Sequence, residues 1–555
     1  MTRRIAIVLG AMLAVAGAAL GVLTSIHARP SADARAAHRC KALLALSDTD
    51  LSVLTAELVP ATTLLPEHCR VTGLIPPTVG FEVRLPTDWN GKFYMVGNGG
   101  YLGRIFDQSY GLARGYATAS TDTGHIGPSP RFGLDRQREI DFAFRAVHVS
   151  VLAAKRLIAA RYGEGPKLSY YRGCSTGGRQ GLMELQRFPA DFDGASITAP
   201  IYDYTLKQTY NAAWVAQALF GNNRAGYVPP RKLEALGKAV YARCDGLDGL
   251  QDGLIDDPRR CDFDPAKQLK RCVPGGDGPD CFTSAQIAAI AKIYDGPGNG
   301  IYPGHVKGAE WMAHRGPGFS GGWDLYFIGK MAAPGEKTPS GAQGGTGGRD
   351  DAYGGDVFKP VQLRNAMSFF RYLAFDPDRP DFNALTDLDF DHLPDTSAMA
   401  AIMNATDPDL TPFYAHGGKL ILSHGWADVG LNPLATVKYY EAIGRAMGKD
   451  VRGQFVRLFM VPGMYHCSGG PGPDLYRDLE ALETWVEQGR APETMIAYKV
   501  ENADQYNARE RTGLRAGARV IRSRPLCAYP KVARYQGHGS LDEASNFACV
   551  APPAS

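Results

Sequence analysis

The sequence lacks the short motifs that mark several large classes of protein. None of its ten cysteines forms a C-x-x-C pair and no C-x-x-C-H occurs, so cysteine-based zinc sites, thiol redox motifs and c-type haem attachment are not predicted. Basic residues form no cluster beyond the N-terminus, and the formal net charge is only +3, so nothing indicates a nucleic-acid partner. With no internal repeat either, the function has to be sought in isolated catalytic or ligand-binding motifs.

The first residues have the pattern of an export signal. Arg3 and Arg4 precede an apolar run over residues 5–23, and the small residues Ala32-Asp33-Ala34 form an A-x-A-like cleavage site. Residues 1–34 are therefore predicted to be a signal peptide. An uncleaved membrane anchor is the alternative, because the apolar run is near the length of a spanning helix. In either case we expect the body of the protein to be secreted or periplasmic, and free of the membrane once a signal is removed.

The rest of the 555-residue chain is too long for one compact core, so two domains or one domain with a large insertion are expected. Short apolar strands alternate with helical stretches from about residue 81 to 199 and again from about 418, which predicts a mostly parallel α/β sheet. This alternation is lost in between. We therefore assign residues 35–201 and 413–555 to one α/β domain, and residues 202–412 to an insertion.

One long helix is predicted over residues 138–163. Ile140, Phe144, Val147, Val151 and Leu152 are expected to share its apolar face.

A serine lies at the predicted junction between a strand and a helix. The stretch Gly173-Cys174-Ser175-Thr176-Gly177 fits G-x-S-x-G, in which a sharp turn exposes a nucleophilic serine and small neighbours avoid clashes. An apolar strand precedes it, and apolar residues at helical spacing follow. The alternative is a glycine-rich turn that only begins a core helix.

A serine nucleophile needs an imidazole as base and a carboxylate that orients the imidazole. Asp428 and His466 follow the serine in the chain order of α/β-hydrolases, and both lie just after apolar strands, where parallel sheets place their chemistry. Two other histidines compete for a place in the site. His424 precedes Asp428 by four residues, and His125 follows an earlier strand.

The cysteines support the same constellation. Cys174 directly precedes Ser175, and Cys467 directly follows His466. If the serine and histidine side chains are within hydrogen-bond reach, the two cysteines come within the roughly 4.4–6.8 Å between Cα atoms that a disulfide requires. We therefore predict a bridge between the nucleophile turn and the histidine loop.

The motifs "GCSTGG", "GWAD" and "YHC" together resemble the tannase and feruloyl esterase family, including its hydrolases of terephthalate monoesters. The resemblance covers most of the chain after residue 40. It implies an α/β-hydrolase fold with a lid, residues 202–412, inserted between nucleophile and acid, and a triad of Ser175, Asp428 and His466. It also implies an oxyanion hole formed by the backbone N–H groups of Thr176 and Gly100, with Gly99 as the alternative to Gly100.

An acidic loop lies between Cys244 and Cys261. Asp245, Asp248 and Asp252 offer the oxygen ligands that calcium prefers, but the spacing is not that of an EF-hand, and a solvated Asp-Gly turn is an equally good interpretation. The resemblance favours a structural Ca²⁺ site, with the carbonyl groups of Leu250 and Leu254 as further ligands.

The resemblance further implies the remaining disulfide pairs, which the spacing alone leaves open. These pairs are Cys40–Cys69, Cys244–Cys261, Cys272–Cys281 and Cys527–Cys549.

The sequence therefore predicts an exported serine carboxylic-ester hydrolase that acts through an acyl-enzyme. The resemblance implies a small aromatic ester as substrate, of the feruloyl, galloyl or terephthalate type. The alternatives are an acyltransferase that uses the same triad, and a non-catalytic binding module stabilised by calcium. The sequence does not predict the oligomeric state.

Overall fold

The computed structural model describes residues 32–298, 300–310, 321–329, 360–501 and 518–552. The predicted signal peptide lies almost wholly outside this range, since the described chain begins at residue 32 with helix α2 (Ala32–Lys41). Within the described part of the chain, no helix is both long enough and apolar enough to cross a bilayer.

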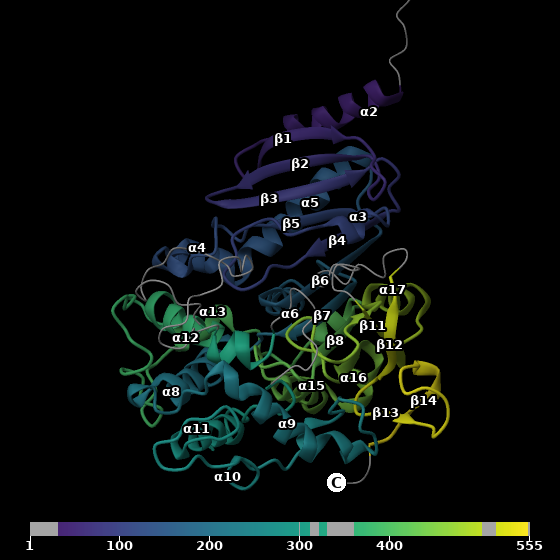
Figure 1. Ribbon diagram of the computed structural model, residues 1–555. Helices are drawn as coiled ribbons and strands as arrows, with labels where there is room; N and C mark the ends of the chain where they lie inside the picture. Colours follow the sequence, from purple (N-terminus) through teal and green to yellow (C-terminus); the bar gives the residue numbers. More distant parts are fainter. Residues whose placement is uncertain (1–31, 299, 311–320, 330–359, 502–517, 553–555) are drawn as a thin grey trace, which may run out of the picture.

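A nine-stranded sheet organises the molecule, with the strand order β1-β2-β3-β5-β4-β6-β7-β8-β9. The strands from β1 to β3 and the pair β3–β5 run antiparallel, whereas the strands from β5 to β9 are parallel. Figure 1 shows the sheet running from the N-terminal strands down to β8. The strands are β1 Ser52–Val59, β2 His68–Ile75, β3 Val79–Pro86, β4 Lys92–Val96, β5 Ala117–Thr121, β6 Leu168–Ser175, β7 Gly194–Pro200, β8 Lys419–Gly425 and β9 Val456–Val461.

Helices cover both faces of this sheet, and each face has its own apolar cluster. On one face, α5, α6 and α15 pack on the central strands, and on the other face α17 packs on β7 and β8. Strands buried on both faces explain why β7 reads as a continuous run of small and apolar residues. The helices of this domain are α3 Ser109–Leu112, α4 Arg136–Ile140, α5 Ala146–Tyr162, α6 Thr176–Arg187, α14 Thr411–Ala415, α15 Pro433–Met447, α16 Lys449–Phe455 and α17 Asp478–Gln488.

The helix predicted over residues 138–163 is interrupted. A π-helical segment, Asp141–Arg145, separates α4 from α5. The prediction for Leu152 was wrong, because this side chain is 51% exposed while its neighbour Val151 is fully buried. Adjacent residues lie about 100° apart around a helix, and Leu152 lies on the side of α5 that faces away from the core.

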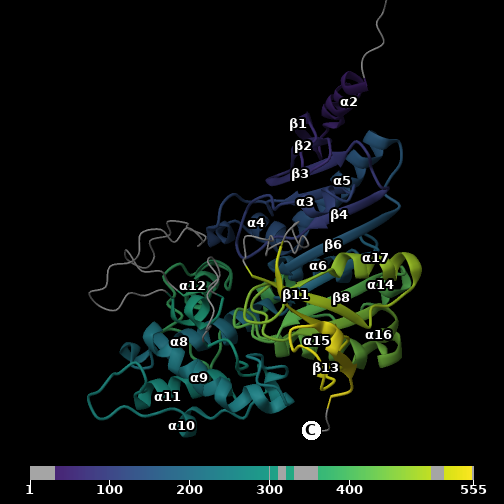
Figure 2. The ribbon, with the colours of Figure 1, turned by 45° about the vertical axis from the view of Figure 1, so that its right-hand side comes forward.

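Between β7 and β8 the described residues form helices and no strand. Figures 1 and 2 both show these helices gathered at one side of the molecule, away from β1–β3. Their buried aromatic side chains, among them Trp323, Phe327, Phe369 and Phe370, form a third apolar cluster. The aromatic residues of this segment are thus largely its own core. The helices are α7 Tyr204–Leu206, α8 Trp214–Phe220, α9 Leu233–Cys244, α10 Pro265–Gln268, α11 Ser284–Asp295, α12 Val361–Tyr372 and α13 Ser397–Met403.

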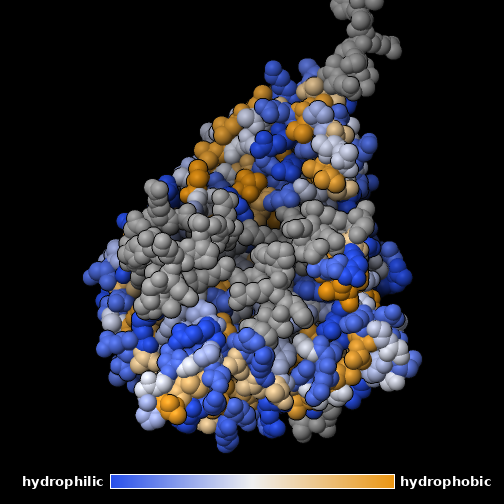
Figure 3. All heavy atoms as spheres, viewed as in Figure 1, coloured by the Kyte–Doolittle hydropathy of each residue, from blue (hydrophilic) through white to orange (hydrophobic). Residues whose placement is uncertain are grey.

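The C-terminal part adds two small antiparallel sheets, β10-β11-β12 and β13-β14. On the face drawn in Figure 3, hydrophilic residues cover most of the described surface, and apolar residues form separate groups. The strands are β10 Leu475–Tyr476, β11 Thr494–Val500, β12 Val520–Cys527, β13 Val532–Tyr535 and β14 Phe547–Val550.

Candidate active site

Ser175 stands at the junction between β6 and α6, as the motif predicts. It is the last residue of β6, and its φ of 61° and ψ of −120° are far from both strand and helix geometry. A non-glycine residue in this conformation is strained and is held in place by its surroundings. The strain turns the serine away from the strand direction, and Ser175 remains partly exposed.

Close backbone packing explains the glycines around this turn. A Cβ atom on Gly173 would lie 2.4 Å from the carbonyl oxygen of Gly177, and one on Gly177 would lie 2.6 Å from that of Asn98. The N–H of Gly177 donates a hydrogen bond of 2.8 Å to the same Asn98 oxygen. Any larger residue at these two positions would push α6 away from the strands that hold it.

Asp428 follows β8 and lies fully buried at the centre of a hydrogen-bond network. His466 donates from Nδ1 to Asp428 Oδ2 at 2.8 Å, and the backbone N–H of Leu431 donates to Oδ1 at 2.9 Å. Burial alone would raise the pKa of Asp428, but the charge of His466 and hydrogen bonds from His424 and His466 bring that pKa well below its usual range. The carboxylate is therefore ionised and orients the His466 ring.

His424 also binds the acid, but it is not in the position of a base. Its Nε2 faces two acceptors, Asp428 Oδ2 at 3.0 Å and the carbonyl oxygen of Leu431 at 3.2 Å, so Nε2 carries the proton. Its Nδ1 lies 2.7 Å from the Thr436 hydroxyl, which must then donate. Both ring nitrogens of His424 are hydrogen-bonded and its side chain is buried, so it holds the Asp428 carboxylate in place and has no free nitrogen to act as a base.

His125, the other competing histidine, lies apart from this network. Its Nε2 is 2.9 Å from the carbonyl oxygen of Tyr101, and its ring stacks on Phe132 with centroids 4.2 Å apart. Burial lowers its pKa. Its contacts are those of a packed structural residue.

The predicted disulfide between Cys174 and Cys467 is present, with Cα atoms 6.0 Å apart. Because Ser175 and His466 are the chain neighbours of these cysteines, the bridge fixes the separation of the nucleophile turn and the histidine loop. The other disulfides are the pairs that the resemblance implied: Cys40–Cys69, Cys244–Cys261, Cys272–Cys281 and Cys527–Cys549.

The residues expected to form the oxyanion hole lie beside one another. The Thr176 hydroxyl donates to the carbonyl oxygen of Gly100 at 3.1 Å, and Thr176 is the first residue of α6, where an N–H has no partner within the helix. Gly100 has a φ of 56°, and no atom lies within 4 Å of the position its Cβ would take. At Gly99, the alternative, a Cβ atom would lie 3.5 Å from the Phe106 ring, so this position is less open than Gly100.

The segment between β7 and β8 contacts the loops that carry Asp428 and His466, which the sequence did not predict. Tyr326 packs edge-on against the His466 ring, with centroids 5.8 Å apart. Gln362 of α12 donates from Nε2 to the carbonyl oxygens of Val429 at 3.0 Å and Gly430 at 2.9 Å. These contacts hold the loop that begins with Asp428.

A family profile described as tannase and feruloyl esterase matches residues 65–550, which include all the elements of this site. The chain belongs to the tannase and feruloyl esterase family. It is therefore a carboxylic ester hydrolase, and its α/β-hydrolase fold, expected from the resemblance, is confirmed.

Relatives within this family match the chain over nearly its whole length. The mono(2-hydroxyethyl) terephthalate hydrolase of Piscinibacter sakaiensis is 34% identical over 541 residues, covering 88% of this chain and 86% of that protein. A probable feruloyl esterase B-2 of Aspergillus terreus is 29% identical and covers 87% and 86%. The crystal structure of feruloyl esterase B from Aspergillus oryzae has a TM-score of 0.75 at 25% identity, covering 93% of this chain and 100% of that one.

The acidic loop between Cys244 and Cys261 brings together one more carboxylate than the sequence predicted. Burial raises the pKa of Asp245 and of Asp248, and the charge of Asp252 adds to both shifts. Asp256, which was not predicted, lies beside them: burial, then the charges of Asp248 and Asp252, raise its pKa well above its usual range. Arg524 forms an ion pair with Asp252. The loop therefore holds several carboxylates whose charges interact, although among the described residues no three of them have ligand atoms within 4.8 Å of one another.

Proposed function

We propose that the protein is an exported serine esterase that hydrolyses esters of aromatic acids through an acyl-enzyme. The observation that carries this proposal is the His466–Asp428 hydrogen bond of 2.8 Å, placed beside the Ser175 turn by the Cys174–Cys467 disulfide. A strained serine, an oriented imidazole and a buried carboxylate are the parts that nucleophilic acyl transfer requires.

In the proposed acylation step, Ser175 Oγ forms a bond to the ester carbonyl carbon while its proton passes to Nε2 of His466. The N–H groups of Thr176 and Gly100 stabilise the oxyanion of the tetrahedral intermediate. When the intermediate collapses, the bond between the carbonyl carbon and the alcohol oxygen breaks. The alcohol leaves with the proton from His466.

In the second half of the proposed reaction, water hydrolyses the acyl-enzyme. His466 takes a proton from the water, whose oxygen attacks the acyl carbon, and returns the proton to Ser175 Oγ as the carboxylic acid is released. Asp428 stays ionised throughout and stabilises the imidazolium that forms in each half of the reaction.

The aromatic substrate class is supported by the relatives. One is a mono(2-hydroxyethyl) terephthalate hydrolase and others are feruloyl esterases, and each matches more than four fifths of this chain. Tyr326, whose ring is nearly perpendicular to the His466 ring, offers an apolar surface beside the proposed base. Aromatic pairs favour such offset or edge-on contacts, so an aromatic acyl group is compatible with this wall.

We also propose that the acidic loop binds Ca²⁺ as a structural ion. Asp245, Asp248 and Asp252 would supply carboxylate oxygens, with the carbonyl groups of Leu250 and Leu254. The loop is closed by the Cys244–Cys261 disulfide and joined to β12 through Arg524 and Asp252. The ion would offset the mutual repulsion of the carboxylates and order this part of the lid.

Export is proposed from two observations. The sequence of residues 1–34 has the pattern of a signal peptide, and all ten cysteines are paired in disulfides, which persist in oxidising compartments.

Labelling with a serine-directed phosphonate, followed by peptide mapping, tests the nucleophile. We expect modification at Ser175. A panel of methyl ferulate, methyl gallate, mono(2-hydroxyethyl) terephthalate and methyl butyrate then tests the substrate class. A higher kcat/KM for methyl butyrate than for every aromatic ester would overturn the aromatic assignment, and preferential transfer to an added alcohol would favour an acyltransferase.

A further inference from the structure

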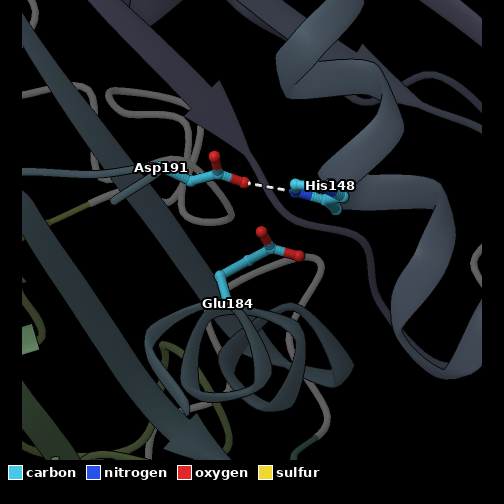
Figure 4. A group of neighbouring side chains, drawn as sticks. All are labelled: His148, Glu184 and Asp191. Atoms are coloured by element: carbon cyan, nitrogen blue, oxygen red, sulfur yellow. Dashed lines mark hydrogen bonds and ion pairs between the residues drawn. The ribbon is translucent and has the colours of Figure 1, made fainter. Parts of the chain in front are cut away.

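Three side chains with metal-binding atoms meet on the helical layer that covers the sheet. His148 comes from α5, Glu184 from α6 and Asp191 from the loop between α6 and β7 (Figure 4). Each offers one ligand atom, and these three atoms lie within 4.8 Å of one another. None of the three residues takes part in the proposed catalytic steps.

Glu184 is the unusual member of this group. Its side chain is 0% exposed, and neither carboxylate oxygen meets the geometry of a hydrogen bond within the described residues; burial, and then the nearby Asp191 carboxylate, raise the pKa of Glu184 well above its usual range. In Figure 4 the carboxyl group lies between the helix and the other two side chains. A buried carboxyl without a partner costs free energy unless something compensates for its lost hydration.

The histidine is already oriented toward the same point. Its Nδ1 lies 2.7 Å from Asp191 Oδ2, and its ring stacks on Phe188 with centroids 3.7 Å apart and planes 7° apart. The stack limits rotation of the ring. The side chain of His148 is 25% exposed, so a small ion can reach the group from solvent on this side.

We propose that His148, Glu184 and Asp191 bind a divalent transition-metal ion, for which zinc is the best fit. One imidazole nitrogen and two carboxylate oxygens form a mixed donor set that suits zinc better than calcium or magnesium, which prefer oxygen alone. Zinc ligands lie about 2.0–2.2 Å from the ion, so tetrahedral donors are about 3.4 Å apart. Shifts on the order of 1 Å would bring these atoms to that spacing, and water would complete the shell.

Binding at Nδ1 replaces the proton that His148 shares with Asp191. A neutral ring then carries its single proton on Nε2, so His148 changes tautomer without a net loss of a proton. Lys155 supplies a positive charge nearby, donating to the Asp191 backbone oxygen at 2.7 Å. It offsets one carboxylate charge and leaves the second for the ion.

The position of the site suggests what the ion would do. Glu184 is eight residues into α6, the helix that begins directly after Ser175, so it lies about 12 Å along the helix from the nucleophile turn. A metal would tie this helix to α5 and to the loop before β7. We therefore expect a structural ion that stabilises the nucleophile helix and takes no part in the reaction.

Equilibrium dialysis of the full exported enzyme against zinc, in excess calcium, tests the proposal. We expect one zinc ion per chain in the wild type and loss of that ion in Glu184→Gln, which keeps the shape of the side chain. His148→Gln, on a different helix, should lose it as well. Asp248→Ala, a control in the acidic loop, should keep it.

Two further measurements separate this site from other binding. Cobalt in place of zinc should give the visible absorption bands of a low-symmetry nitrogen and oxygen site in the wild type and Asp248→Ala only. Zinc should raise the Tm of the wild type and leave that of Glu184→Gln unchanged, while esterase activity without zinc is the same in both. Equal zinc binding by the wild type and both site variants, or none by the wild type, overturns the proposal.

Discussion

The α/β core and the segment between β7 and β8, the proposed lid, contribute to the same candidate site in different ways. The core carries the proposed triad, Ser175, Asp428 and His466, at or just after the ends of parallel strands, and the proposed reaction needs side chains of fixed chemical type there. The lid supplies contacts to backbone atoms, such as the bonds from Gln362 to the carbonyl oxygens of Val429 and Gly430. A side chain that reacts must be of one particular type, whereas a side chain that only positions the backbone can be any hydrogen-bond donor in the right place. The two regions should therefore respond differently to substitution.

The largest effect is expected from Ser175→Ala. Removing the nucleophile of a cooperative triad costs on the order of 10⁶-fold in kcat, while binding and the oxyanion hole retain some catalysis over water. Because no apolar contact is lost, the Tm should stay close to that of the wild type. Steady-state kinetics and a melting curve check both parts, and near-full activity would end the serine esterase assignment.

Asp428→Asn should cost less, on the order of 10⁴-fold. The amide can hold the loop but cannot stabilise the imidazolium, and its NH₂ group opposes the donors of His466 and His424. His424→Ala is the comparison within the core. If His424 only supports the acid, its loss should reduce kcat far less than His466→Ala, and the reverse order would mean that the base was wrongly assigned.

The disulfide beside the triad should have the next largest effect. Replacing both Cys174 and Cys467 by alanine frees the nucleophile turn from the histidine loop, and a misplacement of about 1 Å can cost on the order of a hundredfold in rate. The double replacement of Cys527 and Cys549 is the control, because that bridge also has an ordinary Cα separation, 5.6 Å, but lies in the C-terminal strands.

Both double variants are to be assayed well below their melting temperatures. A similar kcat for the two would show that the Cys174–Cys467 bridge contributes stability alone. The non-reduced peptide map provides an independent check, since it should recover Cys174 linked to Cys467.

The core was the more predictable region, for a physical reason. The turn at Ser175 needs glycines where backbones meet, and the paired cysteines beside Ser175 and His466 made the two motifs support each other. Strands buried on both faces also produce apolar runs that are visible in the sequence. Errors within the core were local: Leu152 was placed on the buried face because apolar character alone does not reveal which side of a helix a residue occupies.

The lid contacts were not predictable in this way. Tyr326 and Gln362 lie in a segment without periodic pattern or motif, and their positions depend on how separate helices pack around the aromatic cluster of the lid. Asp256 was missed because only the folding of the loop brings it next to Asp248 and Asp252. The group of His148, Glu184 and Asp191 comes from two helices and a loop, and its residues have no characteristic spacing.

The lid contacts can be tested with a matched pair of glutamines. Gln362→Leu removes the two hydrogen bonds to the loop after Asp428, and with them the Gln362 oxygen that accepts from the buried Lys207 Nζ at 3.3 Å. We expect a loss of about tenfold in kcat, equivalent to about 1.4 kcal/mol in the barrier, because Asp428 is held less firmly.

Gln217→Leu is the control for this change. Gln217 also donates from Nε2 to two carbonyl oxygens, those of Ala384 at 3.0 Å and Leu388 at 2.8 Å, but both acceptors lie within the lid. Gln362→Leu should lose more stability, because it also removes a partner of the buried Lys207, and after correction for folded protein only Gln362→Leu should lose kcat. Equal kcat values after correction for folded protein would show that the lid does not position the acid.

The smallest effect on the rate is expected at the acidic loop. If Asp245, Asp248 and Asp252 bind calcium, a chelator should lower the Tm by a few degrees, because an ion present at a hundredfold over its Kd stabilises the folded state by about 2.7 kcal/mol. Asp248→Ala should lower the Tm without chelator and abolish the chelator's effect.

Asp262→Ala is the control, since Asp262 directly follows Cys261 but pairs with Arg243 at the surface. Such an exposed pair contributes little to stability, and this variant should keep the full response to chelator. Since the loop lies in the lid and outside the triad, kcat below the melting range should be nearly unchanged in every case. If neither the chelator nor Asp248→Ala changes the Tm, the loop is a solvated turn with Arg524 as its main counter-charge.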